Sequence, residues 1–325
     1  NYFSLLNKEE IFVIHNLILS KTWPLLENSL RFRGKPVIYF EHGIAWHNPE
    51  KNLEKYKRRI SRVDCIIVNS KATALLLKKI YGINKKINVL KSPIYIYENN
   101  KINKNNYKLN ISKQFDKKEN IKLGYLGRLE KHKNPKFLLE IAKYLEKFHN
   151  LNIEVDFIGS GSQKVFLQKL SREMKVSANF LGVVDDRSKH VRDWDFAIFP
   201  STREPLGLVQ GEMALMNKLC LSSYVDGIPE VYPPSTPELL INMVKKNIEN
   251  NDLQNNFQFI HQFSKFDSCF YPDIEDCAKK IIKLKENPKL YEDLLRKYKK
   301  FLYSNFSIEK HNEELKKVLR NYLME

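Results

Sequence analysis

The sequence predicts an α/β protein built from two doubly wound domains, each a parallel sheet with helices packed on it. Short apolar runs bounded by turn residues alternate with segments of helical period, which is the pattern of parallel βα units. A Lys- and Asn-rich stretch without apolar periodicity, residues 97–120, interrupts this pattern, which then starts again. A length of 325 residues suits two domains of ordinary size, and we place the linker in that stretch.

The first half has the pattern of half a doubly wound domain. We expect buried strands over 11–14, 36–40 and 65–68, and a fourth that starts over 87–90. Ser70 follows the third strand and is a favoured N-cap for the apolar helix that comes next.

The second half continues the alternation. Asn134 is expected to cap a helix that has Pro135 at its first position, because proline is favoured there. Residues 232–272 are rich in Pro, Asn, Gln and Phe and are expected to be irregular. The predicted strands are 122–126, 153–158, 178–181, 196–199 and 219–222, and the predicted helices are about 163–175, 208–217, 273–286, 288–303 and 307–323.

Composition excludes several classes of protein. No apolar run approaches the ~18 residues of a membrane span. The four cysteines form no CxxC pair of the kind that binds zinc, so a reducing compartment is the default. The net charge is +17, and residues 1–115 hold 21 Lys and Arg against 8 Asp and Glu. This charge either attracts a polyanion, such as a nucleotide diphosphate or an anionic membrane, or is merely solvated surface.

Ligands of open α/β sheets bind at the carboxyl ends of the strands, so the residues after each strand are the candidate sites. After the strand at 122–126, Gly127 starts a loop in which Arg128 and Lys133 precede a helix and are suited to neutralise a diphosphate. After the next strand, Gly159 and Gly161 either let the backbone approach a ligand closely or only form a tight turn.

The segment 200–212 is the most specific. Pro205 and Gly207 prevent a continuous helix, so Glu204 lies on a loop and Glu212 on the helix that begins near Leu208. Glu212 is placed to accept hydrogen bonds from a ribose diol. Glu204 stands at the mouth of the helix, where the amides of Leu206, Gly207 and Leu208 turn toward a phosphate, or it only complements the helix dipole.

Polar residues also follow strands of the first half. Glu41, His42 and Gly43 come after the strand at 36–40, and His15 comes after the strand at 11–14. Residues 226–230, Asp-Gly-Ile-Pro-Glu, follow the strand at 219–222 and pass for a turn. Together, two βα domains, a cationic loop and two carboxylates eight residues apart suggest a nucleotide-sugar enzyme, and no HExxH, P-loop or GxSxG motif is present.

These residues resemble the family 4, or "group 1", retaining glycosyltransferases of GT-B fold. The matching run covers about 121–231, and Glu41–Gly43 together with Phe306, Ser307 and the last helix match outside it. The motifs in the run are Gly127-Arg128-Leu129 with Lys133, Ile158–Gly161, Phe180–Gly182, Phe199–Ser201, the glutamate pair, and Gly227–Val231.

The resemblance implies two Rossmann-like domains that face a cleft. It implies a first, acceptor-side domain over 1–110, a nucleotide-sugar-binding domain over 120–303, and a closing helix over 304–325 that crosses back to the first domain. Family members open with a βαβ stretch that carries a Gly-rich loop, and nothing before Ile11 supplies one. The first domain is therefore expected to lack these opening elements, because the chain is partial or because its acceptor site is built differently.

The resemblance also implies the site. Arg128 and Lys133 hold the diphosphate of a nucleotide-sugar donor, Glu204 and the amides of residues 206–208 hold the sugar and phosphate, and Glu212 holds the ribose. Gly127, Gly159 and Gly161 line the donor site, and His42 faces the sugar from the acceptor side. The donor is a co-substrate, so no cofactor is expected, and cations with helix N–H groups replace a metal.

Two residues and one segment depart from the family pattern. Asn134 stands where the family usually has glycine, and Asp226 stands where glycine is common. Residues 232–272 look like an insertion in place of a short continuation that contains glycine.

Rival functions have less support. A non-hydrolysing sugar-nucleotide epimerase shares the fold, but the glutamate pair and Gly227–Glu230 favour transfer. A non-catalytic sugar-nucleotide-binding partner subunit is the main alternative. A nucleic-acid partner is not expected, because only the charge suggests one.

The acceptor is expected to be lipid-linked or a nascent polysaccharide on the cytoplasmic face of the membrane. Five cations lie within eight residues of a predicted helix, near Trp46 and Tyr56, and such clusters suit peripheral docking on anionic lipid. These cations are Lys55, Lys57, Arg58, Arg59 and Arg62.

Overall fold

The computed structural model describes residues 12–15, 21, 25, 28, 36–46, 49–94, 120–246 and 258–323. The chain divides into two compact units. Of the described residues, the first unit holds those up to Pro93 and those from Phe306 onward, and the second unit holds the rest.

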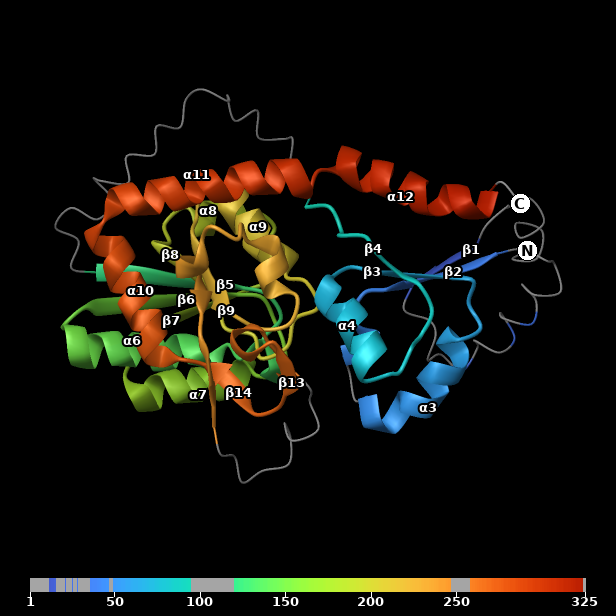
Figure 1. Cartoon of the computed structure of the whole chain (residues 1–325). Helices are drawn as coiled ribbons and strands as arrows, with labels where there is room; N and C mark the ends of the chain where they lie inside the picture. Colours follow the sequence, from blue (N-terminus) through green and yellow to red (C-terminus); the bar gives the residue numbers. More distant parts are fainter. Residues whose placement is uncertain are drawn as a thin grey trace. The chain divides into compact units, whose positions relative to one another are not determined.

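The first unit contains a four-stranded parallel sheet in the order β1-β2-β3-β4. Its strands are β1 (Phe12–His15), β2 (Val37–Glu41), β3 (Cys65–Val68) and β4 (Ile87–Val89). Every residue of β2 and β3 is buried, as expected for runs of Val, Ile, Tyr and Phe covered on both faces. Figure 1 shows helices α3 (Pro49–Ile60) and α4 (Lys71–Lys79) on one face of this sheet. The predicted cap is confirmed, because the Ser70 side chain accepts a hydrogen bond from the backbone N–H of Thr73.

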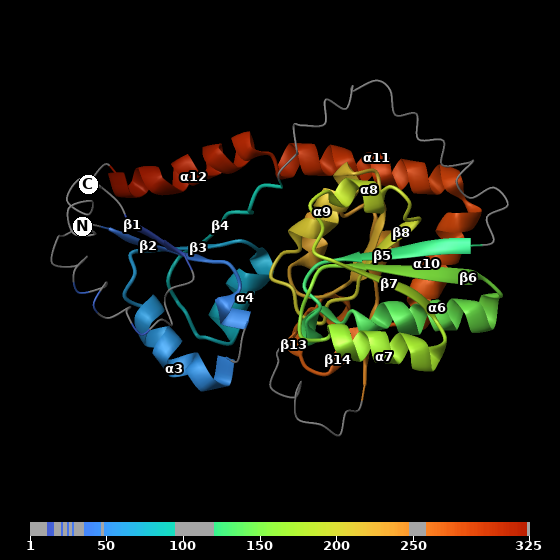
Figure 2. The same cartoon turned by 180° about the vertical axis from the view of Figure 1, so that it is seen from behind.

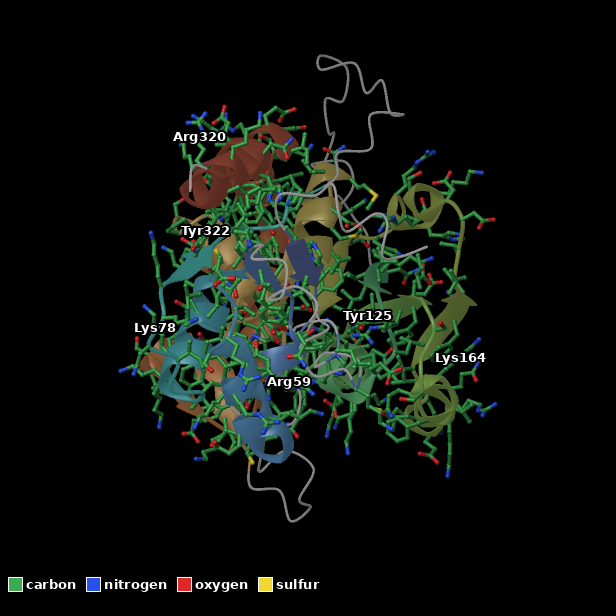
Figure 3. The ribbon with its side chains drawn as sticks, turned by 90° about the vertical axis from the view of Figure 1, so that its right-hand side faces the viewer. Arg59, Lys78, Tyr125, Lys164, Arg320 and Tyr322 are labelled. Atoms are coloured by element: carbon green, nitrogen blue, oxygen red, sulfur yellow. The ribbon has the colours of Figure 1, made fainter. Side chains whose placement is uncertain are left out.

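Helix α12 (Ile308–Leu323) covers the other face of the first sheet, as Figures 1 and 2 show. Its apolar residues recur at helical spacing and pack on the sheet core. They are Leu315, Val318, Leu319 and Tyr322, set against Ile38, Phe40, Cys65, Ile67 and Leu90. Arg320, between them in sequence, lies on the outer side of the helix (Figure 3). The end of the described chain therefore completes the core of the first unit.

The second unit contains a six-stranded parallel sheet in the order β10-β9-β8-β5-β6-β7. The strands are β5 (Asn120–Leu126), β6 (Asn152–Ile158), β7 (Ser177–Gly182), β8 (Phe196–Phe199), β9 (Cys220–Ser223) and β10 (Leu240–Ile241). The strand order reverses between β5 and β8, and this switch point is where doubly wound sheets bind ligands.

Helices cover both faces of the second sheet. Helices α6 (Lys136–His149) and α7 (Lys164–Met174) lie on one face, and α8 (Arg187–Val191) and α9 (Leu208–Leu215) lie on the other (Figures 1 and 2). Helix α10 (Ile274–Glu286) packs on α6, and α11 (Pro288–Asn305) packs on α9. The phenol of Tyr291 joins α11 to the sheet, because it donates to the Asp195 carbonyl and accepts from the Leu219 N–H.

The predicted strands and helices are present, with ends that shift by one or two residues, but two predictions are wrong. Asn134 does not cap α6, which begins at Lys136. It ends a 3-10 turn over Lys131–Lys133 in the left-handed conformation, with φ 51°. Asparagine tolerates this conformation better than most residues, which is why it can stand where the family has glycine.

The second correction concerns residues 232–272, which are not simply irregular. Their described part holds β10 and four further strands, β11 (Met243–Lys245), β12 (Gln258–Ile260), β13 (Lys265–Asp267) and β14 (Phe270–Pro272). Strand β11 pairs with β14 and β12 pairs with β13, both antiparallel. Strands of two or three residues are too short to show an alternation in sequence. Two expectations concern residues outside the described ones. They are the lack of opening βαβ elements before Ile11 and the linker over 97–120, of which only the last residue is described.

Candidate active site

Hydrogen bonds join the loops after β5 and β6. The Gly127 N–H donates to the Ile158 carbonyl at 2.9 Å, and the Leu129 N–H donates to the Ser160 carbonyl at 2.9 Å. A Cβ atom at Gly159 would lie 2.0 Å from the Gly127 carbonyl oxygen, and one at Gly161 would lie 2.5 Å from the Leu129 carbonyl oxygen. These two glycines are therefore required by the contact between two backbones, which accounts for them without a ligand.

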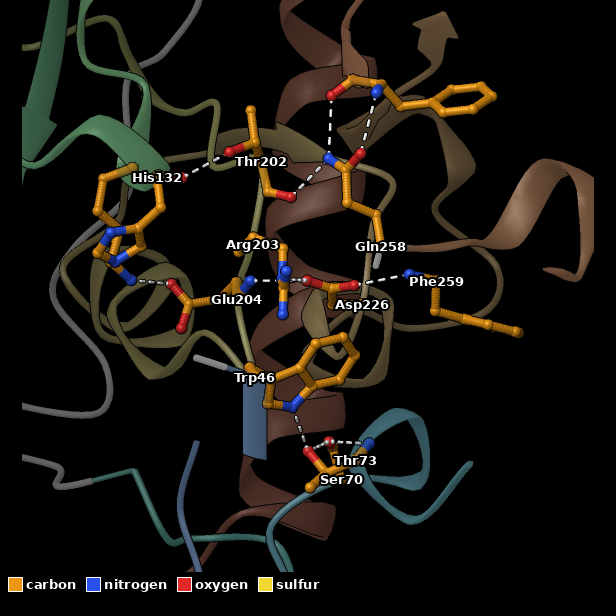
Figure 4. Close-up of polar contacts among 12 residues, drawn as sticks. Trp46, Ser70, Thr73, His132, Thr202, Arg203, Glu204, Asp226, Gln258 and Phe259 are labelled. Atoms are coloured by element: carbon orange, nitrogen blue, oxygen red, sulfur yellow. Dashed lines mark hydrogen bonds and ion pairs between the residues drawn. The ribbon is translucent and has the colours of Figure 1, made fainter. Parts of the chain in front are cut away.

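An ion pair joins Lys133, on the loop after β5, to Glu204, on the loop after β8. It forms between Nζ and Oε2, and both side chains are mostly buried. The two loops are also tied through their backbones, because the Thr202 N–H donates to the His132 carbonyl at 2.8 Å (Figure 4). The structure thus brings together two of the predicted catalytic residues at the switch point of the sheet.

Arg128 lies on the same loop as Lys133, with an exposed side chain. Its carbonyl accepts a hydrogen bond from the phenol of the buried Tyr125 at 2.8 Å. This contact fixes the backbone of Arg128 while its guanidinium faces solvent.

The backbone of Glu204 is held on both sides by the turn after β9. Its N–H donates to Oδ2 of Asp226 at 3.0 Å (Figure 4). Its carbonyl accepts from the Gly227 N–H at 3.0 Å. A Cβ atom at Gly227 would lie 1.9 Å from the Pro205 carbonyl oxygen, so this turn and the Glu204 loop are in backbone contact. Asp226 has φ 50°, a second left-handed position where the family often has glycine.

The N-terminus of α9 begins directly after this loop. Gly207 is its N-cap, with φ 91°, and a glycine offers no side chain to the free N–H groups of the first turn. Leu206 and Gly207 are buried and Leu208 is half-buried, so their amides are presented by a fixed backbone. As predicted, Glu204 precedes the helix and Glu212 lies within it.

Glu212 has a partner that the sequence analysis missed. Nη1 of Arg187, the first residue of α8, lies 2.6 Å from Oε2 of Glu212. Burial raises the pKa of Glu212, and the Arg187 guanidinium opposes that rise. Arg187 comes shortly after β7, so the rule that ligands lie at strand ends could have found it if applied to that strand.

In the first unit, His42 pairs with His15. Nδ1 of His15 lies 2.7 Å from Nε2 of His42, and the His42 ring also stacks on Phe40 at 4.4 Å between centroids. Burial, and then the nearby His15, lower the pKa of His42 to about 4. His42 is therefore neutral at physiological pH, and the adjacent strands β1 and β2 bring the two predicted strand-end histidines together.

Glu41, beside His42, has a structural role. Its fully buried carboxylate accepts hydrogen bonds from the phenols of Tyr39 and Tyr56 and from the N–H groups of Gly43 and Ala45. Four donors to one buried carboxylate fix the turn that carries His42.

The predicted cluster of aromatic and basic residues is wrong in part. Trp46 and Tyr56 are buried, because they form the apolar side of α3 and of the turn before it. The indole of Trp46 donates to Oγ1 of Thr73 at 2.9 Å (Figure 4). Arg59 is only 7% exposed, whereas Arg58 and Arg62 are exposed and Lys57 lies 3.3 Å from Glu54. The surface of α3 therefore offers cations without aromatic anchors.

Each unit is a parallel sheet with helices packed on it. The second unit has a helix N-terminus and a Lys–Glu pair at its switch point, which is where α/β proteins of the nucleotide-binding class hold their ligands. Residues 107–257 match the family "Glycosyl transferases group 1". This match covers a little under half of the chain, and the chain has the GT-B fold of the solved structures described next.

Three proteins illustrate the likeness. The chain is 26% identical over 238 residues to the capsular polysaccharide biosynthesis glycosyltransferase CapH of Staphylococcus aureus. The aligned region covers 71% of this chain and 64% of CapH. The structure of Anabaena HepE in complex with UDP matches with a TM-score of 0.71 at 16% identity, over 98% of this chain and 81% of HepE. TarM of Staphylococcus aureus matches with a TM-score of 0.67 at 16% identity, over 99% and 57% of the two chains. The chain thus spans less than two thirds of the length of CapH.

The described residues hold neither a membrane-spanning helix nor a cluster of metal ligands. No helix among them is long and apolar enough to cross a bilayer. Within the same residues, no three His, Cys, Asp or Glu side chains are grouped so that they could hold a metal ion.

Proposed function

We propose that the protein is a family 4 retaining glycosyltransferase, which moves a sugar from a nucleotide-diphosphate donor to a lipid-linked or polysaccharide acceptor. The family match over 107–257 supports the reaction class. The names of its relatives support the substrates, since HepE has been solved with UDP and with UDP-glucose, and CapH is named for capsular polysaccharide biosynthesis.

The observation that carries this proposal is the Lys133–Glu204 pair beside the N-terminus of α9. A leaving diphosphate gains negative charge as the glycosidic bond breaks, and a lysine with free helix N–H groups stabilises that charge. Arg128 adds a second cation from the same loop. In the absence of donor, Glu204 neutralises Lys133, and donor binding exchanges this partner for phosphate.

The two glutamates then have different roles. Glu204 binds the sugar while its backbone is held in place by the turn after β9. Glu212, paired with Arg187, accepts hydrogen bonds from the ribose. Gly127, Gly159 and Gly161 shape the loops on which the donor rests.

We infer that transfer occurs on one face of the sugar. The bond between the anomeric carbon and the diphosphate oxygen breaks, the acceptor oxygen bonds to the same face, and the acceptor proton passes to the leaving diphosphate. Neutral His42 serves as a hydrogen-bonding group toward the sugar. Cations and helix N–H groups fill the role of a metal, so the reaction requires neither a metal ion nor a cofactor.

A transfer assay tests this proposal. The protein is incubated with nucleotide-diphosphate sugars and either a lipid-linked or a polysaccharide acceptor, with and without excess EDTA, and release of nucleoside diphosphate is measured. Release that depends on acceptor and survives EDTA supports the proposal. Loss of turnover in EDTA that manganese restores would contradict its metal-free part.

The main alternative is a partner subunit that binds a sugar nucleotide without transferring it. Calorimetric binding of a nucleoside diphosphate, without turnover on any donor and acceptor pair, would favour that alternative.

A further inference from the structure

The carboxylate of Asp226 is fully buried between the Glu204 loop and the chain segment that begins at Gln258. Its Oδ2 accepts from the Glu204 N–H at 3.0 Å, and its Oδ1 accepts from the Phe259 N–H at 2.8 Å. Each oxygen of one carboxylate therefore holds a different stretch of backbone, as Figure 4 shows.

The segment on the far side of Asp226 is itself fastened to the same loop. The Gln258 amide donates to the Thr202 carbonyl at 2.7 Å and to the Phe270 carbonyl at 2.9 Å, and it accepts from the Phe270 N–H. Residues 258–270 thus form a brace, which contacts the loop at Thr202 directly and at Glu204 through Asp226.

We propose that Asp226, in its ionised form, is a positioning residue for Glu204, and that the brace and this carboxylate together hold the Glu204 loop in its active conformation. The proposal rests on the function proposed above and adds a residue that makes no contact with substrate. A carboxylate can satisfy both N–H donors at once. A protonated carboxyl turns one acceptor oxygen into an O–H group, which leaves one of the two backbone stretches without its partner.

The charges around Asp226 favour a change of ionisation near neutral pH. Burial raises the pKa of Asp226 to about 7, while Arg203 and the two N–H donors oppose the rise and Glu204 adds to it. Nε of Arg203 lies 3.8 Å from Oδ2. On the brace, Nε2 of His261 lies 2.6 Å from the Asp226 carbonyl oxygen, and burial lowers the pKa of His261 although the charge of Glu230 opposes this. Lys133 pairs with Glu204, one of the charges beside Asp226.

The sign of the pH effect follows. Ionised Asp226 is the positioning form, so kcat rises as the pH increases through about 7. In the proposed function Glu212 holds the ribose, and Lys133 and Arg128, on the loop after β5, hold the diphosphate. The affinity for nucleoside diphosphate therefore changes little over this pH range.

The experiment compares the wild type with Asp226→Asn and Asp226→Gly, two residues that tolerate a φ of 50°. Asn accepts only one of the two hydrogen bonds and does not titrate, and Gly accepts neither. We expect kcat at alkaline pH to fall about 10- to 100-fold in both variants, with the pH dependence near 7 removed and nucleoside diphosphate affinity nearly unchanged. Asp293→Asn is the control, because Asp293 pairs with Arg296 on α11, outside the brace, and should leave the profile unchanged.

A second readout does not depend on turnover. In NMR titrations, the amide resonances of Glu204 and Phe259 should shift with a midpoint near pH 7 in the wild type and not in Asp226→Asn. Full activity of Asp226→Gly, or amides that do not titrate, would overturn the proposal. If these amide resonances shift with pH but the protein transfers no sugar, the proposed function is wrong, whereas the positioning of Glu204 by Asp226 still holds.

Discussion

Nζ of Lys133 pairs with Oε2 of Glu204 although the two residues are 71 positions apart in sequence. Strands β5 and β8 are neighbours in the sheet, so the loops that follow them meet at its carboxyl edge. This pair joins the cation expected on the leaving group to the carboxylate expected on the sugar, and the predictions below test that division of roles.

Removing a cation should slow transfer without unfolding the protein. Lys133→Ala and Arg128→Ala are each expected to raise the barrier by about 3 kcal/mol, because each removes stabilisation of the leaving diphosphate. Steady-state rates measure this. Lys143→Ala is the control, since Lys143 pairs with Glu146 further along α6, away from the loop after β5. Near-normal turnover in both loop variants would show that the donor site is wrongly assigned.

Titration calorimetry should distinguish the binding roles of the two glutamates. Glu212→Ala is expected to weaken free nucleoside diphosphate and intact donor alike, because both contain the ribose. Arg187→Ala should act in the same direction, since the guanidinium orients that carboxylate. Glu204→Ala should weaken only the sugar-dependent part of binding. If Glu204→Ala and Glu212→Ala weakened free nucleotide equally, the division of roles would be lost.

His42 should titrate near pH 4, well below an ordinary histidine. Its folded pKa lies below the unfolded value of about 6.5, so the folded state binds fewer protons between these values. The contribution of His42 to the free energy of unfolding is therefore lost as the pH falls through that window. NMR titration of its ring protons measures the pKa. His15→Phe, which removes a nearby charge and keeps a ring, should raise the His42 pKa, whereas His149→Phe on α6 should not change it. A wild-type pKa at or above 6.5 would contradict this account.

Gly159 should tolerate no side chain. A Cβ atom there would lie 2.0 Å from the Gly127 carbonyl oxygen, so Gly159→Ala must separate two hydrogen-bonded loops. We expect a loss of about 3 kcal/mol or more in the free energy of unfolding, measured by urea denaturation. At Gly182, with φ 71° and no atom within 4 Å of a built Cβ, alanine meets backbone strain alone and should cost about 1 kcal/mol. Equal losses would mean that the contact between the loops is not what requires glycine.

Membrane docking by α3 is the prediction that the structure revises. The buried Trp46 and Tyr56 cannot serve as anchors, so binding should be purely electrostatic. Replacing Lys57, Arg58 and Arg62 by Gln should reduce co-sedimentation with anionic vesicles, and added salt should do the same. Removing three charges from α7, at Lys164, Lys169 and Arg172, is the control. Equal losses in the two triple variants would show that only net charge matters.

Two departures from the family pattern show how far local sequence can be interpreted. By the resemblance, Asn134 stands where glycine is usual and Asp226 where glycine is common, and both adopt positive φ, at 51° and 50°. Both positions therefore keep the left-handed backbone conformation that glycine adopts readily, because Asn and Asp adopt it more easily than other residues with a side chain. The sequence placed Asp226 correctly after a strand, but it wrongly made Asn134 a helix cap and did not indicate that the Asp226 carboxylate also binds the Glu204 backbone.

The sequence by itself determined the order of the longer strands and helices, the loop position of Glu204 and the helical position of Glu212. Each of these depends on periodicity, caps or breakers within a few residues. Only the tertiary structure decided which strand ends become neighbours, and so paired Lys133 with Glu204, Glu212 with Arg187 and His42 with His15. It also decided that Trp46 and Tyr56 face the core and that the short strands after residue 240 brace the site. The Lys133–Glu204 pair depends on non-sequential strand order, and the other outcomes depend on burial and on how distant segments pack, which no local pattern encodes.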